Sequence, residues 1–209
     1  MEYWDTIAAQ RHSLADQLAA LTPDQWATPS LCAAWTVRDV AAHLLVGPMV
    51  SMPSFALAMI KARGNFNRAN EAMTARVATR STDDLVADLR RFADHRFRPP
   101  GFGSEAPLTD VLVHGQDIRI PLGLDTPPPV DPWRHVLEFV VTAKARRAFA
   151  GFPLPPVRLE ATDVDWSHGT GEPVTGPAIP LALALLGRPA LANQLDGAGV
   201  ALLIDPTDR

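Results

Sequence analysis

The stretch TDVLVHGQDIRIPLG, residues 109–123, decides the fold, because three ionisable side chains interrupt an otherwise apolar run. They are Asp110, His114 and Asp117. Successive residues of an α-helix turn by about 100°, so Asp110 and His114 lie about 40° apart and Asp117 lies about 20° to the other side of Asp110. We therefore expect one stripe that faces into a helical bundle together with the apolar residues. The opposite face then carries Gly115, Gln116 and Arg119.

This stripe is a candidate metal site, because a buried carboxylate is costly unless it is paired or binds a metal. Asp110 and His114, four residues apart, provide half of a site for a divalent metal. We expect the third ligand to be His43, whose neighbours in VAAHLL are apolar. Such a set leaves positions open for water or substrate and suits Zn²⁺, and also Fe²⁺, Ni²⁺ or Mn²⁺. Asp117 would orient a ligand or be a fourth ligand.

Plainer interpretations of the same residues stay open. Two histidines and two aspartates can form a satisfied hydrogen-bond network without a metal. Cys32 lies in a proline-rich connection, and we expect it to be a packed free thiol. Arg119, on the far side of the stripe, is expected at the surface or in an ion pair between domains. His168 follows Trp166 on the inward side of an expected strand and is interpreted as an ordinary hydrogen-bonded histidine.

Hydrophobic periodicity predicts a mainly helical chain up to residue 152. The expected helices cover residues 4–21, 36–62, 81–97, 107–119 and 132–150, and the second is expected to be disturbed near Pro48 and Pro53. Thr36 is a clear helix start, with Asp39 three residues further on in a capping-box-like pair. Pro121 and Gly123 are expected to end the helix that carries the ionisable stripe.

The period changes after Pro153. Alternating apolar residues predict strands over 157–162 and 164–168, followed by a short helix over 177–188 and a last strand over 199–204. The expected architecture is an antiparallel four-helix bundle plus a fifth helix, with a small α+β domain at the C-terminus. Residues 1–152 would form the helical domain and residues 153–209 the accessory domain.

Composition excludes several classes of function. The 209 residues are 47% hydrophobic and 20% charged, with a formal net charge of −4. Since no block of Lys and Arg is present, a nucleic-acid partner is not expected. We expect no membrane association either, because neither a signal peptide nor a spanning segment is visible. A single cysteine excludes an internal disulfide. The expected location is the cytoplasm, as a monomer or a homodimer.

Two motifs together resemble the mycothiol-dependent maleylpyruvate isomerase-like family, within the DinB-like metal-binding four-helix bundles. They are CAAWTVRDVAAHL, residues 32–44, and DVLVHGQDIRIPLG, residues 110–123. The C-terminal segments ATDVDWSHGTG and LLGRPALANQLDGAGV resemble the accessory domain of that family. The family histidine corresponds to His43, and the family's acid and histidine pair corresponds to Asp110 and His114. The characterised pattern has Glu at the acidic position, where this chain has Asp110.

The resemblance implies a divalent metal, usually zinc, and a low-molecular-weight thiol, mycothiol, as cosubstrate. It implies an isomerase or a thiol transferase that acts on an electrophilic small molecule. The alternative is a catalytically silent protein of the same fold that binds a metal or another ligand. The catalytic residues and the substrate do not carry over from the resemblance.

Overall fold

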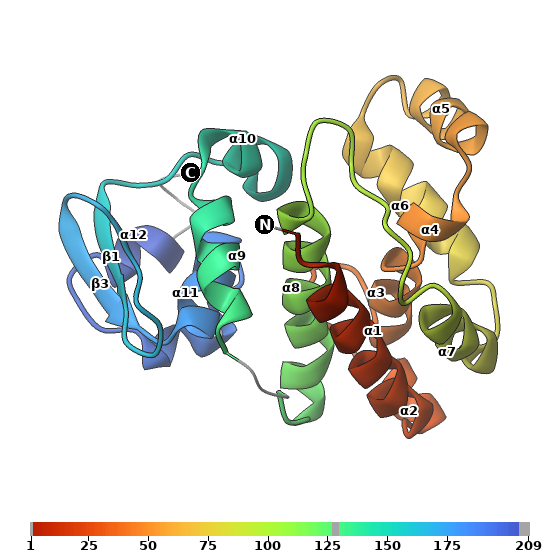
Figure 1. The fold of residues 1–209 in the computed structure, drawn as a ribbon, viewed down its shortest axis with the longest axis horizontal. Helices are drawn as coiled ribbons and strands as arrows, with labels where there is room; N and C mark the ends of the chain where they lie inside the picture. The colour runs from red at the N-terminus through yellow and green to blue at the C-terminus, as the bar shows by residue number, and fades with distance from the viewer. Residues whose placement is uncertain (1, 127–129, 205–209) are drawn as a thin grey trace. The chain divides into compact units, whose positions relative to one another are not determined.

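The computed structural model describes residues 2–126 and 130–204. The chain divides into two compact units, Met1–Pro127 and Pro128–Arg209 (Figure 1). The first unit is helical and the second combines helices with a small sheet, so the predicted mainly helical fold with a small C-terminal α+β part is confirmed.

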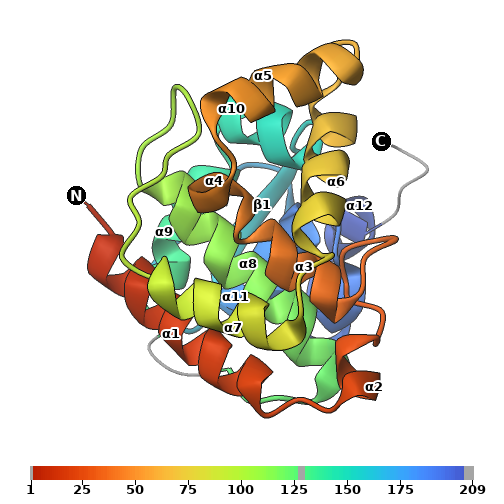
Figure 2. The same ribbon diagram turned by 90° about the vertical axis from the view of Figure 1, so that its right-hand side faces the viewer.

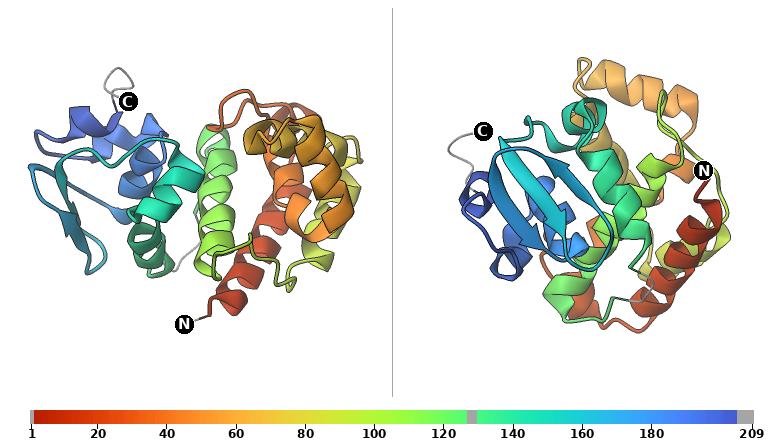
Figure 3. Two further views of the ribbon diagram at one scale, coloured as in Figure 1. Left: turned by 90° about the horizontal axis from the view of Figure 1, so that it is seen from above. Right: turned by 60° about the vertical axis from the view of Figure 1, so that its left-hand side comes forward.

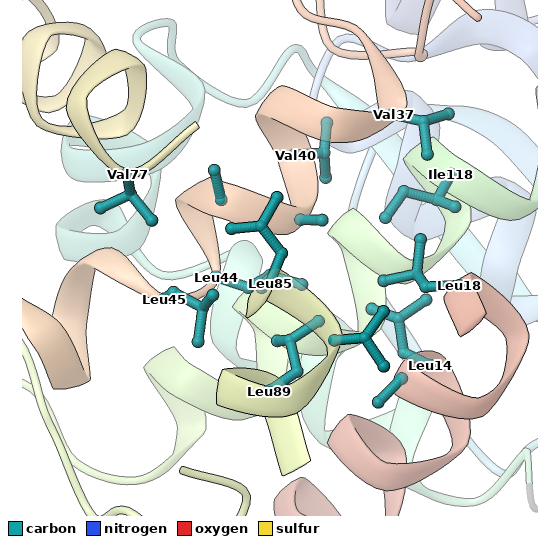
Figure 4. Close-up of a cluster of buried hydrophobic side chains, with 14 of the residues drawn as sticks. Leu14, Leu18, Val37, Val40, Leu44, Leu45, Val77, Leu85, Leu89 and Ile118 are labelled. Atoms are coloured by element: carbon teal, nitrogen blue, oxygen red, sulfur yellow. The ribbon is translucent and has the colours of Figure 1, made fainter. Parts of the chain in front are cut away.

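Helices of different lengths build the first unit. They are α1 (Trp4–Ala19), α2 (Pro23–Trp26), α3 (Val37–His43), α4 (Val46–Met49), α5 (Met52–Lys61), α6 (Phe66–Val77), α7 (Thr82–Arg91) and α8 (Glu105–Leu122). Figure 2 shows α1, α3, α7 and α8 packed together, with α6 against α3. Their apolar stripes meet in one core, of which Figure 4 shows a part. Leu14 and Leu18 of α1, Leu85 of α7 and Ile118 of α8 are buried in it.

The helix expected over residues 36–62 is interrupted, and the structure has α3, α4 and α5 in its place. Its start is as predicted, because Thr36 and Asp39 form a complete capping box. Ser51 accepts a hydrogen bond from the Ser54 amide and begins a new helix. Pro53, in the first turn of α5, suits a helix start, where its missing N–H costs nothing. Helix α6, capped by Asn65, was not anticipated.

The second unit begins with helical segments. They are α9 (Pro132–Val140), α10 (Ala143–Ala145) and the π-helical turn η1 (Arg146–Ala150), in place of the single helix expected over 132–150. The unit continues with β1 (Val157–Ala161), β2 (Ser167–Gly169), β3 (Glu172–Gly176), α11 (Ala178–Leu185), the 3₁₀ segment η2 (Pro189–Gln194) and α12 (Val200–Ile204). Helix α9 packs against α11 within this unit. The units therefore divide near residue 127, whereas the change of sequence period suggested residue 152.

The sheet has the order β2-β1-β3, with β1 in the centre (Figure 3). Strand β2 pairs antiparallel with β1, and β3 pairs parallel with it, with Leu159 opposite both His168 and Val174. The strand expected over 199–204 is wrong, since these residues form α12. The reason is that the run GVALLI is apolar throughout, and periodicity alone does not separate a strand from a buried helix in such a run. Strand β3 was not anticipated, because Glu172 to Gly176 is short and contains Pro173.

Among the described residues, no helix combines the length and the apolar character that crossing a membrane requires.

Candidate metal centre

The candidate ligands come from two helices of the first unit, α3 and α8, which pack against each other. His43 is the last residue of α3. Asp110 and His114 lie one turn apart on α8. The capping box at Thr36 sets where α3 begins, and buried Val40 holds the helix against the core. The position of His43 is therefore determined by a short helix that is fixed at its first turn.

The three side chains that the sequence suggested as metal ligands lie together in the structure. His43 Nε2 is 3.3 Å and His114 Nε2 is 3.5 Å from the same atom, Asp110 Oδ1. One ligand atom from each of the three residues lies within 4.8 Å of the others. The two imidazole side chains are 15% and 13% exposed, and the Asp110 side chain is 39% exposed. The cluster is thus closed on the histidine side and open at the carboxylate.

These distances suit a divalent cation. Two ligand atoms bound at about 2.0–2.1 Å in tetrahedral geometry lie about 3.3 Å apart. The two distances from Asp110 Oδ1 are close to that spacing. Two imidazole nitrogens and one carboxylate oxygen are also a usual donor set for zinc and for neighbouring transition metals. The residues present therefore fit the metal that the family resemblance implies.

Asp117 contacts His114 from the other side of the ring. Its side chain is fully buried, and its Oδ2 lies 2.8 Å from His114 Nδ1. With Asp117 ionised, its carboxylate only accepts hydrogen bonds, and the N–H at Nδ1 of His114 is the donor. This contact leaves Nε2 of the same ring facing Asp110. Asp117 therefore contacts His114 at the nitrogen that does not face Asp110, and it lies outside the cluster of His43, Asp110 and His114.

The charge of Asp110 is stabilised by its neighbours. Burial raises the pKa of this carboxyl, but the charge of His43 and its hydrogen bond act in the opposite direction, as do the charges of His114 and Arg11. The result is a pKa lowered to about 2. Asp110 is therefore an anion at any ordinary pH and is available as a ligand.

Trp35 forms an apolar wall beside the two histidines. Its ring centroid is 5.0 Å from that of His43 and 6.4 Å from that of His114, while the two imidazole centroids are 4.7 Å apart. Trp35 directly precedes the N-cap of α3, so the same turn that starts the helix also positions this ring. The two rings are tilted by 45° to each other, and the buried Nδ1 of His43 has no hydrogen-bond partner among the described residues.

Helix α8 corrects the prediction for Arg119. Arg119 is only 1% exposed, and its Nε donates to Gln17 Oε1 at 2.8 Å. Gln116 is equally buried. The helical spacing predicted the angles between the residues of α8 correctly. The prediction for Arg119 was wrong because it assumed that the face opposite the ionisable stripe is exposed to solvent. Since α8 is buried nearly all round, Arg119 lies inside, and burial lowers its pKa to about 10.

Cys32 lies nearer to the cluster than the sequence suggested. Its Sγ lies within 4.8 Å of a ring nitrogen of His114 and a carboxylate oxygen of Asp117. The sequence separates Cys32 from these two residues by about 80 positions, so only a contact between the loop and α8 reveals the proximity. His168, by contrast, is exposed on β2 and stacks on Trp166, which corrects the expectation that it faces inward.

Comparison with known proteins agrees with this architecture. Residues 7–99 match the family model of the mycothiol maleylpyruvate isomerase N-terminal domain, a span that includes His43 and ends before α8. Two solved structures resemble the chain over 92% of its length and 90% of theirs, each with a TM-score of 0.59. One is a mycothiol-dependent maleylpyruvate isomerase, 16% identical, and the other is a histidine-to-alanine mutant with that name, 15% identical.

At these identities the structural likeness establishes the fold. No curated protein sequence matches the chain. The match of residues 7–99, which carry the histidine motif of the first unit, agrees with a fold shared over both units. Residues 7–99 thus match the mycothiol maleylpyruvate isomerase N-terminal domain, and the chain as a whole has the fold of the two solved isomerases.

Proposed function

We propose that this protein is a metal-dependent and thiol-dependent enzyme, an isomerase or a thiol transferase that acts on an electrophilic small molecule. The observation that carries the proposal is the convergence of His43, Asp110 and His114 on one point at spacings that suit a cation. The family name and the two solved relatives supply the second argument, since those proteins are mycothiol-dependent isomerases. Mycothiol is therefore the thiol cosubstrate that we infer.

In this proposal the residues of the site have different roles. His43, Asp110 and His114 would hold the cation, with zinc as the first choice and nickel, iron or manganese as alternatives. A cation in this place would supply Lewis acidity towards a thiol, because a thiol that coordinates a metal is deprotonated. Asp117 keeps the His114 ring in one orientation and one tautomer. Trp35 excludes water from the histidine side of the cluster.

The open side of the cluster supports an enzyme. Three protein ligands leave a position for an exchangeable molecule, whereas structural zinc sites are usually closed by four. Asp117, which could have closed the site, is engaged with the far nitrogen of His114. The exposed edge of Asp110 leaves access from solvent.

Aspartate in place of the glutamate of the characterised pattern is compatible with this role. Asp is one methylene shorter, so a poor fit would leave the carboxylate out of reach of the second helix. Asp110 Oδ1 instead lies within 3.5 Å of both Nε2 atoms. The shorter side chain therefore reaches both histidines from its position on α8.

The test begins with metal analysis of the purified protein and continues with cobalt substitution. We expect about one cobalt ion per chain and, on addition of a thiol, a sulfur-to-cobalt charge-transfer band, since the thiol enters the open position. The experiment should use the Cys32→Ser variant beside the natural protein, so that the chain's own sulfur cannot produce the band. Thiol-dependent conversion of maleylpyruvate and of other electrophiles is then measured with the zinc form.

Two results would contradict the proposal. Absence of bound metal, in protein that is folded by circular dichroism, would favour the hydrogen-bond network without a metal. Bound metal with no thiol band and no thiol-dependent turnover would favour the silent binding protein.

A further inference from the structure

Cys32, His114 and Asp117 form a second group of possible metal ligands, in which Cys32 has no part in the proposed function. One ligand atom from each lies within 4.8 Å of the others. The group shares His114 with the first cluster, and its Asp117 lies at Nδ1 of that ring, whereas Asp110 of the first cluster lies at Nε2. We propose that these three residues form a second cation site, which takes a thiophilic divalent ion such as Cd²⁺ or Zn²⁺.

The chemistry of the two groups differs in one atom that decides selectivity. The first group offers two nitrogens and an oxygen, whereas the second offers a sulfur, a nitrogen and an oxygen. Thiolate ligands select soft and borderline cations, so a cation with high affinity for sulfur favours the second group. Cys32 is the only cysteine of the chain, and any thiolate signature from the protein therefore reports this residue.

A backbone hydrogen bond holds the loop that carries Cys32 against α8. Pro121 has no N–H, so the carbonyl of Asp117, four residues earlier, lacks its usual partner within the helix. The backbone N–H of Leu31 donates to that carbonyl at 3.1 Å. This bond places the residue before Cys32 directly against the turn of α8 that carries Asp117.

Further hydrogen bonds hold the loop in shape. The N–H of Cys32 donates to Ser30 Oγ at 3.1 Å, and the N–H of Trp35 donates to the Cys32 carbonyl at 3.1 Å. The Cys32 side chain is thus presented by a backbone with defined contacts. A set of ligands held in this way loses little freedom when it binds an ion, which favours binding.

Binding of an ion at the second site changes the protonation of His114 and Cys32. In the metal-free protein the ion takes the place of the proton at His114 Nδ1, which moves to Nε2 as the ring changes tautomer, and the thiol proton of Cys32 goes to the buffer. The two former hydrogen-bond partners, now 2.8 Å apart, would have to separate by about half an ångström to reach tetrahedral ligand spacing. Asp117 then no longer holds His114 through a hydrogen bond, which couples the two sites.

The experiment is a titration of the metal-free protein with Cd²⁺, followed through the thiolate-to-cadmium charge-transfer absorption in the ultraviolet. We expect the band in the natural protein and in His43→Ala, because His43 belongs only to the first group. We expect its loss in Cys32→Ser and its loss or strong weakening in His114→Ala. Cys32→Ser should still bind cobalt through the first group, and His12→Ala serves as a control that changes nothing.

A second measurement uses only the natural protein and therefore does not depend on whether the variants fold. In the natural protein, Cd²⁺ should slow alkylation of Cys32 by iodoacetamide, which intact mass reads directly because the chain has one cysteine. Absence of both the band and the protection would overturn the proposal. Loss of the band in His43→Ala would also overturn it, since Cys32 would then be an additional ligand of the first group. A band that persists unchanged in His114→Ala would show cadmium on the thiol alone.

Discussion

His114 is the residue on which the candidate site depends, because its two ring nitrogens contact different partners. Nε2 faces Asp110 and the first cluster, while Nδ1 donates to the buried Asp117. A histidine ligand that donates its other N–H to a carboxylate is fixed in orientation and is a stronger ligand. The two aspartates of α8, seven residues apart, therefore have different roles in our proposal.

Asparagine substitutions separate these roles. Asp117→Asn should still bind metal, weakened about 10–100-fold, because the amide orients His114 less well but removes no ligand. Asp110→Asn should weaken binding much further, since it removes a coordinating charge. Metal affinity is measured by competition with a chelator, with His12→Ala as the control. Equal losses in the two asparagine variants would instead make Asp117 a ligand and close the site.

The acid titration of Asp110 is expected to depend on His43. In the metal-free protein the pKa of Asp110 is lowered to about 2, below the ordinary value of 3.8, so its contribution to stability is present above pH 3.8 and is lost as the pH falls towards 2. His43→Ala removes the largest attractive contribution and should raise this pKa. The carboxyl carbon signal of Asp110, followed by NMR, measures the change. A pKa that stays the same in His43→Ala would mean that the pair does not interact.

At the scale of elements, α3 has the greatest influence on the candidate site, because it is short and its last residue is a candidate ligand. It has seven residues, begins at the capping box of Thr36 and Asp39, and ends at His43. With so few turns, fraying at the first turn reaches the last. Helix α7 offers a comparison, since the Ser81 side chain accepts a hydrogen bond from the Asp84 amide at its start but no candidate ligand lies on it.

Removal of the two caps should therefore have different consequences. Thr36→Ala and Ser81→Ala should each lower the free energy of unfolding by about 1 kcal/mol, the usual cost of losing an N-cap. Only Thr36→Ala should also lower metal affinity, because it loosens the helix that presents His43. Chemical denaturation and chelator competition measure the two effects. Equal losses of affinity in both variants would show that overall stability, and not α3, governs the site.

At the scale of the whole molecule, every candidate ligand lies in the first unit. His43, Asp110 and His114, together with Cys32 and Asp117, fall within Met1–Pro127, and the buried cluster of α1, α3, α7 and α8 lies in the same unit. The apolar residues of α9, among them Trp133 and Leu137, are buried in the chain, and α9 packs against α11. Residues 128–152 therefore belong with the second unit, although they precede the change of sequence period.

Truncated chains test this division. A fragment of residues 1–127 should fold and bind metal with an affinity close to that of the full chain. A fragment of residues 1–152, the domain suggested by periodicity, should aggregate more, because α9 would lose α11 and expose Trp133 and Leu137. Circular dichroism, light scattering and chelator competition provide the measurements, with His114→Ala in the shorter fragment as the control. A shorter fragment that fails to fold while the longer one does would restore the boundary near residue 152.

Local patterns in the sequence determined much of this protein. The capping pair at Thr36 and Asp39 marked the start of α3, and the helical period placed Asp110, His114 and Asp117 on one stripe of α8. These features depend on residues three or four positions apart, whose relative placement on a helix is set by backbone geometry. His43 was suggested because its neighbours in VAAHLL are apolar, which predicts that it faces the core. Its use as a metal ligand, with Asp110 and His114, stays a prediction.

Tertiary contacts decided the rest. Arg119 is buried because other parts of the chain cover the second face of α8, and no pattern within α8 contains that information. Cys32 lies beside His114 because the N–H of Leu31 donates to the carbonyl of Asp117 and so holds the loop against α8. The run at 199–204 became a helix because an apolar run fits either structure and its surroundings choose between them. Backbone geometry fixes short-range relations, whereas burial and the partners of unpaired groups depend on segments distant in the chain.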